Sequence, residues 1–328
     1  MDGSTLSTLT SPIILFFVLG MIAALVRSDL AIPEAVAKGL SIYLMIAIGL
    51  KGGIAVAKSG VNGTVLTAAG AGMALSFALP VLAFAALRWF GRLDRLNAGA
   101  VAAHYGSVSV VTFVTALDIL TDQGMPPAGY MVAVLAVMET PAIVSGLLLA
   151  RSGTGTAAKG QADEGDTSEL WHEVFLNASV VLLVGSFVIG MIAGPQGFKD
   201  IQPMFESGFK GALCLFLLDM GLIAARRLRA SRAITIRIAT LAIAMPMING
   251  AIGVLVGHAI GLELGSVAAL GVLCASASYI AVPAAMRMAL PQADPGIYLT
   301  MSLSLTFPFN ILFGIGLVSL FARYLAGA

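Results

Sequence analysis

Two short segments place serine and glycine inside otherwise apolar stretches, and their side chains have the clearest capacity for chemistry. They read HYGSVSV from His104 and CASASYIAVP from Cys274. Serine hydroxyls donate hydrogen bonds and can reorient, and a helix that restarts beside them offers unpaired N–H groups with a partial positive charge. These donors suit a small anion. The predicted anion ligands are Gly106, Ser107, Ser109, Ser276 and Ser278.

The composition shows which solvent surrounds these segments. Hydrophobic residues make up 59% of the 328 residues and charged residues 11%, with a mean hydropathy of +0.97. A water-soluble domain of this length does not carry so little charge. The sequence therefore predicts an all-α, multi-pass membrane protein.

Each serine segment lies in the middle of an apolar stretch, where a break in a helix has consequences. Glycine, serine and, in the second segment, Pro283 favour such a break. Lipid cannot satisfy the freed backbone groups, so a broken helix must line a cavity inside the protein. The alternative is that small residues simply allow close helix packing. Recurrence of the pattern in both halves favours the binding site.

Oxygen-bearing side chains near two matched prolines, Pro141 and Pro308, suggest a place for a cation. A kink at proline exposes carbonyl oxygens, and sodium prefers hard oxygen ligands. An ionisable group inside a membrane span costs about 2.5 to 3.5 kcal/mol, although Glu139 could simply bond a neighbouring helix. The predicted cation ligands are Glu139, Thr140, Thr306, Asn310 and Thr112, and no metal beyond sodium is expected.

Lys51 and Asp219 are two further charges within apolar stretches. Alignment of Gly52 with Gly221 puts Asp219 opposite Leu50, so the two charges fall at nearly equivalent positions. We expect a buried structural ion pair between them. A direct role of Lys51 in binding the substrate is the alternative.

An internal repeat with an offset of about 170 residues organises these features. The string GMIA begins at Gly20 and again at Gly190, Pro33 and Pro203 follow at the same offset, and the paired serines recur at nearly the same offset. A duplication with polar residues inside apolar spans is typical of secondary transporters, whose site lies between the repeats.

Counting apolar stretches of about 17 to 25 residues predicts ten membrane spans as a 5+5 inverted-topology repeat with discontinuous helices in each half. Five spans is an odd number, so the second half enters from the opposite side. The predicted spans are 11–27, 35–57, 62–88, 97–117, 127–150, 174–194, 205–225, 233–260, 265–288 and 297–321.

The basic residues predict the orientation. Thirteen of the 18 lysines and arginines fall on one side of this topology, and Lys51, Lys58, Lys199, Lys210 and Arg323 fall on the other. The positive-inside rule then places both termini outside and the segment between the halves in the cytoplasm.

Residues 152–173 are the polar stretch between the halves. They predict a division into a first repeat (1–151), a cytoplasmic linker (152–173) and a second repeat (174–328). A short polar segment of this kind is too small to fold alone. A tether is the favoured interpretation, and a docking strip for a regulator is the alternative.

Several functions are disfavoured. A net charge of +1 without a basic stripe argues against nucleic acid. No H-E-x-x-H metal motif, nucleophile elbow or phosphate-binding loop occurs, so we do not expect an enzyme. Cys214 and Cys274 lack the spacing of a metal or redox motif.

The chain resembles the sodium-dependent bicarbonate transporter family, typified by cyanobacterial carbon-concentrating permeases. The resemblance rests on the IPE and IG-x-x-GG strings of the first repeat, the paired serines and the segment around TFPFNI. It implies a homotrimer of ten-helix protomers in the cytoplasmic membrane, which imports bicarbonate together with sodium. It assigns the substrate to the five serine-segment residues and allows a PII-like cytoplasmic regulator.

This chain also departs from the family pattern. Tyr279 stands where relatives have an aspartate, Lys51 and Asp219 replace uncharged residues, and the linker is shorter. Three alternatives therefore remain: a cation/proton antiporter that uses Glu139 or Asp219, a sodium symporter of another small monocarboxylate, and a membrane receptor or scaffold that signals through the linker.

Overall fold

The computed structural model describes residues 11–60, 62–152, 178–230 and 234–327. These residues are helical, and no strand occurs among them. Most of the predicted linker lies outside them. In chain order the first half contains α2 (Pro12–Leu25), α3 (Glu34–Ser59), α4 (Gly63–Trp89), α5 (Arg95–Gly106), α6 (Val110–Asp122), α7 (Met131–Glu139) and α8 (Pro141–Arg151).

The second half follows the same order of long and interrupted helices. It contains α10 (Ala178–Phe198), the π-helix η1 (Pro203–Ser207), α11 (Phe209–Ala230), α12 (Ile236–Ala259), α13 (Leu264–Ala275), α14 (Ala281–Ala289), α15 (Pro295–Leu299), η2 (Thr300–Thr306), α16 (Phe307–Phe309), η3 (Asn310–Gly314) and α17 (Ile315–Ala326).

Eight helical segments among the described residues are long and apolar enough to cross a membrane. Two shorter apolar helices, α2 and α13, accompany them. The segment from Arg95 to Asp122 contains α5 and α6, and 94% of its most apolar 18-residue stretch is buried inside the protein. In the other seven segments the buried share of the corresponding stretch is at most 61%. The first serine segment therefore lies at the centre of the molecule.

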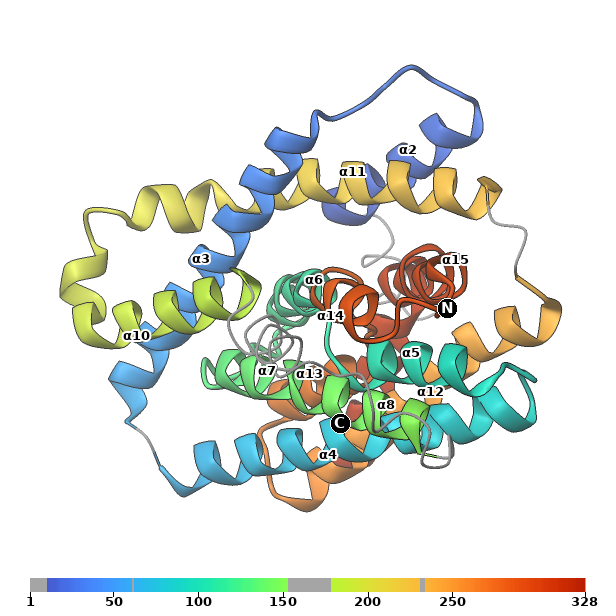
Figure 1. Cartoon of the computed structure of the whole chain (residues 1–328). Coiled ribbons are helices and arrows are strands. Elements are labelled where there is room, and N and C mark those ends of the chain that lie inside the picture. The colour runs from blue at the N-terminus through green and yellow to red at the C-terminus, as the bar shows by residue number, and fades with distance from the viewer. Residues whose placement is uncertain (1–10, 61, 153–177, 231–233, 328) are drawn as a thin grey trace.

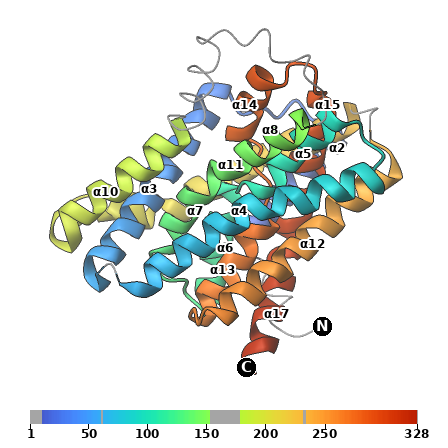
Figure 2. The ribbon, with the colours of Figure 1, turned by 60° about the horizontal axis from the view of Figure 1, so that its bottom comes forward.

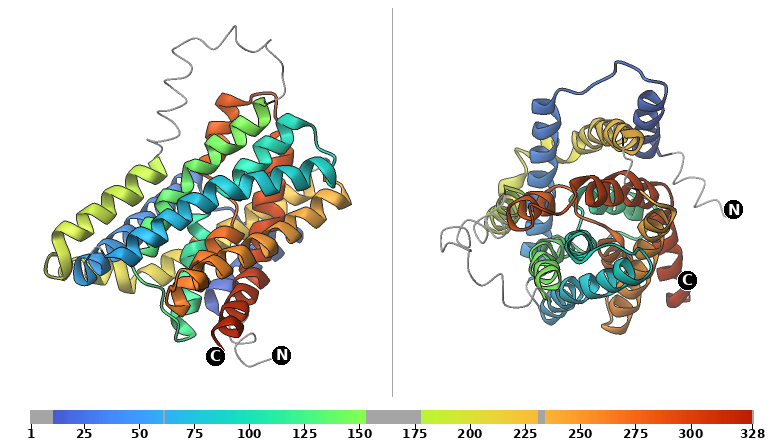
Figure 3. Two further views of the ribbon diagram at one scale, coloured as in Figure 1. Left: turned by 90° about the horizontal axis from the view of Figure 1, so that it is seen from below. Right: turned by 45° about the vertical axis from the view of Figure 1, so that its right-hand side comes forward.

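The helices divide into two groups. The helices α2, α3, α10 and α11, which we call the four-helix group, lie along one side, and the others form the main group (Figures 1 and 3). Within the four-helix group, α10 runs along α3, as Figure 2 also shows, and α11 runs along α2. Each of these pairs joins one helix of the first half to one of the second.

Glycine makes both pairs possible, because the backbones approach too closely for a side chain. A Cβ at Gly190 would overlap the carbonyl oxygen of Leu50, and one at Gly20 would overlap that of Leu218. The reciprocal positions are Gly53 and Gly221, which meet the carbonyl oxygens of Phe187 and Phe17. The predicted register is thus wrong by one residue: Gly53, not Gly52, corresponds to Gly221. In this register Lys51 and Asp219 are equivalent.

Several predicted spans differ in detail from the structure, and three of them illustrate how. The span 127–150 is two helices that meet at Thr140 and Pro141. The span 174–194 extends to Phe198, with a kink at Gly194, where φ is 58°. The span 297–321 extends from Pro295 to Ala326 and contains two π-helical stretches on either side of Pro308.

Candidate functional site

Both serine segments interrupt helices, at the residues the sequence indicates. The helix α5 ends at Gly106 and α6 begins at Val110. The helix α13 ends at Ala275 and α14 begins at Ala281. Ser107 and Ser276 are extended at the corresponding helix ends, with φ of −84° and −79°. The two interruptions therefore have the same form.

The two interruptions contact each other. The Ser109 N–H donates to Ser276 Oγ at 2.9 Å, and the Ser278 N–H donates to the His104 carbonyl at 2.9 Å. Ser276 Oγ in turn donates to the Leu273 carbonyl at 2.8 Å. Backbone groups freed by one break are thus bonded by the other, which keeps both breaks satisfied in an apolar interior.

A small cavity, which we call the serine cavity, lies beside this contact. It has a volume of about 20 Å³, which is room for roughly one water molecule. A larger anion requires the surrounding helices to move apart. Apolar residues of α3, α6 and α11 form much of its wall. Its polar lining residues are Ser109, Ser278 and Tyr279 of the two interruptions, Ser41 of α3 and Glu139 at the end of α7.

Only two of the five predicted anion ligands line this cavity, Ser109 and Ser278. Ser107 Oγ donates to the Glu139 carbonyl at 3.0 Å, and Ser276 Oγ is bonded as described above. Gly106 packs on α4, where a Cβ would overlap Pro80. In this structure Ser276 joins the two interruptions, Ser107 bonds the end of α7 and Gly106 packs on α4, whereas Ser109 and Ser278 line the cavity.

Glu139 is the one predicted cation ligand on the cavity wall. Its side chain is 2% exposed, and Oε2 has no hydrogen-bond partner. A buried, unpaired carboxylate oxygen is costly, so it suits a position that meets a cation or a proton.

The other predicted cation ligands lie around the interruptions. Thr112 Oγ1 donates to Ser109 Oγ at 3.0 Å, and Thr306 Oγ1 donates to the Ala242 carbonyl at 2.6 Å. Asn310 Nδ2 donates to the carbonyl of Ala275, the last residue of α13, at 2.8 Å. Thr140 follows Glu139 at the joint of α7 and α8. The five residues therefore do not form one ligand shell in this structure.

The expected ion pair between Lys51 and Asp219 is not formed. The Lys51 ammonium lies 4.5 Å from the centroid of the Phe209 ring. Phe209 precedes Asp219 by ten residues on α11, a rise of about 15 Å. Lys51 lies on α3, which packs along α10, and Asp219 lies on α11, which packs along α2, and this arrangement separates the two charges.

Sequence reasoning missed Ser41 and undervalued Tyr279. Both line the cavity, and the Tyr279 side chain is buried. Ser41 is a single polar residue in an apolar stretch, so the sequence gives no signal for it, and only its place in the cavity wall identifies it. Tyr279 is visible in the sequence as a departure from the family pattern.

The model of one protein family matches residues 12–323, nearly the whole chain. The chain belongs to the Na+-dependent bicarbonate transporter superfamily. This membership and the apolar helices identify a multi-pass membrane protein of sodium-dependent bicarbonate transport. A transporter superfamily also favours a role other than enzyme catalysis. No curated protein shows a significant match to the sequence.

Proposed function

We propose that this superfamily member imports bicarbonate by symport with sodium across the cytoplasmic membrane, with the anion held between the two interrupted helices. The observation that carries the proposal is the hydrogen bond from the Ser109 N–H to Ser276 Oγ, which joins the two interruptions beside a buried cavity. Ser109 and Ser278 supply hydroxyls to the anion, and Glu139 supplies a carboxylate to the sodium ion.

A 5+5 inverted repeat of ten spans explains the paired architecture. The reciprocal glycine contacts of α3 with α10 and of α2 with α11 support it. The halves are residues 1–151 and 174–328, joined by the linker 152–173. Both termini lie outside and the linker lies in the cytoplasm. Transport then proceeds by movement of one helix group against the other around the central site.

Assembly and control follow from the family resemblance. We propose a homotrimer surrounded by membrane lipid. A PII-like regulator would dock on the cytoplasmic linker, most of which lies outside the described residues.

Uptake of labelled bicarbonate into proteoliposomes tests the proposed symport. An inward sodium gradient should drive uptake, and an equal potassium gradient should not. Equal uptake in both gradients would contradict sodium coupling. If acetate or another monocarboxylate competes better than bicarbonate, the substrate assignment is wrong and the chain is a symporter of a different anion.

A cation/proton antiporter is the second candidate, because Glu139 Oε2 is buried, unpaired and on the cavity wall. It predicts proton movement against sodium without bicarbonate, and this movement would be lost in Glu139→Gln. A pH-sensitive dye inside the liposomes separates the two functions. Sodium-driven proton flux without bicarbonate favours the antiporter, whereas its absence favours the symporter.

A further inference from the structure

A second cavity, of about 410 Å³, lies between the four-helix group and the main group. Its walls come from α3, α6, α11, η1 and the start of α7 with the residues before it. The charged and polar lining residues are Lys51 of α3, Asp118, Thr121 and Asp122 of α6, Glu206 of η1 and Lys210 of α11, and Phe209 of α11 lies beside them. We call this space the lysine vestibule. It is large enough for a small hydrated ion, unlike the serine cavity.

The lysine vestibule continues the serine cavity along the same two helices. On α3, Leu44 and Met45 line the serine cavity, and Ile48 and Lys51 line the vestibule one and two turns later. At a rise of 1.5 Å per residue, Leu44 and Lys51 are about 10 Å apart along the axis. On α6, Val114 faces the cavity and the following turn faces the vestibule.

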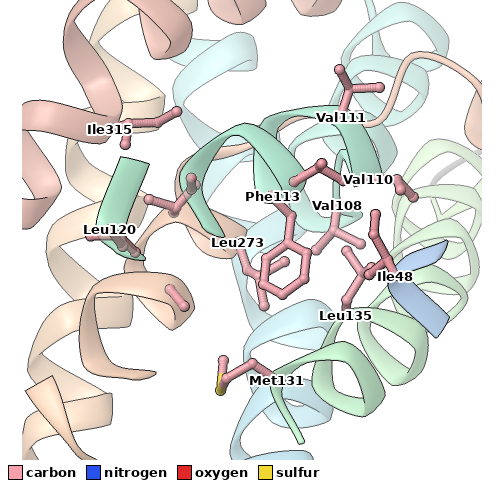
Figure 4. Close-up of a cluster of buried hydrophobic side chains, with 14 of the residues drawn as sticks. Ile48, Val108, Val110, Val111, Phe113, Leu120, Met131, Leu135, Leu273 and Ile315 are labelled. Atoms are coloured by element: carbon pink, nitrogen blue, oxygen red, sulfur yellow. The ribbon is translucent and has the colours of Figure 1, made fainter. Parts of the chain in front are cut away.

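Apolar side chains separate the two spaces. Ile48 extends from α3 toward Val110 of α6 and Leu135 of α7 (Figure 4). Ile48 is 2% exposed and Leu135 is fully buried. An ion in the vestibule is therefore one apolar layer away from the serine cavity.

Lys51 is the unpaired cation of the vestibule. Its ammonium stacks on the Phe209 ring, and no carboxylate of the described residues lies within ion-pair distance of it. The neighbouring acids are engaged elsewhere: Lys210 Nζ lies 3.1 Å from Asp118 and 3.2 Å from Asp122. Glu206 accepts a hydrogen bond from Gln202 Nε2 at 2.6 Å. A lysine inside an apolar helix is costly, and this one retains its capacity to bind an anion.

The surrounding charges have both signs. An adjoining cavity of about 460 Å³ shares Lys51 and Glu206 with the vestibule and adds Lys58 and Lys199. Together the two spaces contain four lysines and three acids, a net charge of +1. Walls of mixed sign suit a route that a cation and an anion both use.

We propose that the lysine vestibule is the extracellular access site of the transporter and that Lys51 binds a small monovalent oxyanion there before it passes Ile48 to the serine cavity. This inference rests on the proposed function and adds a second anion site to it. The extracellular side is the one to which the basic-residue count assigns Lys51, Lys58, Lys199 and Lys210.

The test uses Lys51→Cys in a background where Cys214 and Cys274 are alanine, in intact cells. Loss of the ammonium should raise the KM for bicarbonate about tenfold and change the maximal rate little. External aminoethyl methanethiosulfonate restores an ammonium at this position and should restore the KM. The sulfonate reagent adds a negative charge and should raise the KM further. Lys38→Cys, at the other end of α3, is the control and should resist the external sulfonate reagent, whose fixed charge keeps it from crossing the membrane.

Bicarbonate should also slow the reaction of Lys51→Cys with the sulfonate reagent, and this readout does not require transport. The proposal is overturned if the Lys51→Cys thiol reacts only from the cytoplasmic side, or if bicarbonate does not slow its reaction. It is also overturned if the KM for bicarbonate is the same for the positively and the negatively charged adduct. If the unmodified protein shows no sodium-driven bicarbonate uptake, the proposed function fails, and the protection assay still decides whether the vestibule binds an anion.

Discussion

At the scale of single residues, the four serines of the two interruptions have two different roles. Ser107 and Ser276 use their hydroxyls to bond carbonyls at the ends of helices, whereas Ser109 and Ser278 line the serine cavity. The sequence predicts both serine pairs as a group, because glycine and serine inside an apolar span signal a break. The sequence does not show which serines bond carbonyls and which line the cavity, because the direction of a side chain in a non-helical segment depends on how the other half of the chain packs against it.

This division predicts different outcomes for alanine substitutions. Ser278→Ala removes a hydroxyl from the anion, so the KM for bicarbonate should rise by about five- to tenfold, the effect of one hydrogen bond of about 1 to 1.5 kcal/mol. Ser276→Ala removes the acceptor of the Ser109 N–H and should instead lower the thermal stability of the purified protein. Uptake kinetics and melting curves measure the two effects. Ser145→Ala, a serine on α8 away from the cavity, is the control. Equal changes in KM for Ser278→Ala and Ser145→Ala would contradict the assignment.

At the scale of helices, the repeat is visible in the sequence but its register is not. Gly52 and Gly53 are adjacent, and only the contact of Gly53 with Phe187 shows which of them corresponds to Gly221. The prediction of an ion pair between Lys51 and Asp219 is wrong for a related reason. The helix α10 of the second half packs on α3 of the first half, and α2 of the first half packs on α11 of the second. Local sequence does not show that each half packs its first helix against the other half.

The glycine contacts make a prediction for α10. A side chain at Gly190 would overlap α3, so Gly190→Ala should destabilise the protein by about 1 to 3 kcal/mol, as overpacking does. Gly185 lies on the same helix, and a Cβ there would have no neighbouring atom within 4 Å, so Gly185→Ala should be neutral or slightly stabilising. Thermal unfolding in detergent compares them. Equal stability of the two variants would contradict the close approach of α10 and α3.

The start of α5 offers a test by pH. Asp94 accepts hydrogen bonds from the Asn97 N–H at 3.0 Å and from Asn97 Nδ2 at 2.5 Å. Burial opposes the ionised form, but these hydrogen bonds outweigh it, and the pKa of Asp94 lies below its usual 3.8. A lowered pKa stabilises the fold above pH 3.8, and this contribution is lost as the pH falls through the folded pKa.

Asp94→Ala should therefore cost about 1 kcal/mol at pH 7, the usual value of a helix cap. Asp94→Asn retains an acceptor and should cost less. Melting curves from about pH 7 to pH 3 should show the difference between the unmodified protein and Asp94→Ala shrinking below about pH 4. A difference that is constant over this range would show that the charge of Asp94 does not contribute.

At the scale of the whole molecule, Lys210 connects the two helix groups. Its side chain, on α11 of the four-helix group, forms ion pairs with Asp118 and Asp122 on α6 of the main group. The Lys210 side chain is 57% exposed, and ion pairs that remain in contact with solvent contribute about 0.2 to 1 kcal/mol. That is enough to change the ratio of two conformations by up to about fivefold. The two ion pairs therefore favour the arrangement of the two groups that this structure shows.

Lys210→Ala should shift the protein toward arrangements in which the two groups lie further apart. Spin labels attached at Gly211→Cys on α11 and Thr121→Cys on α6 report the distance between the four-helix group and the main group by pulsed electron paramagnetic resonance. We expect a larger fraction of long distances in Lys210→Ala, and no change in Lys199→Ala, whose lysine makes no ion pair with a described residue. Identical distance distributions in all three proteins would show that the ion pair does not hold the groups together.

The central claim is that both interrupted helices bind one bicarbonate ion. A cryo-microscopy map of the protein in sodium bicarbonate, compared with one in potassium chloride, tests this most directly. We predict density for a small planar anion within hydrogen-bond distance of Ser109 and Ser278, in a cavity larger than 20 Å³. Bicarbonate density elsewhere, with the serine cavity still closed in both maps, would contradict the claim.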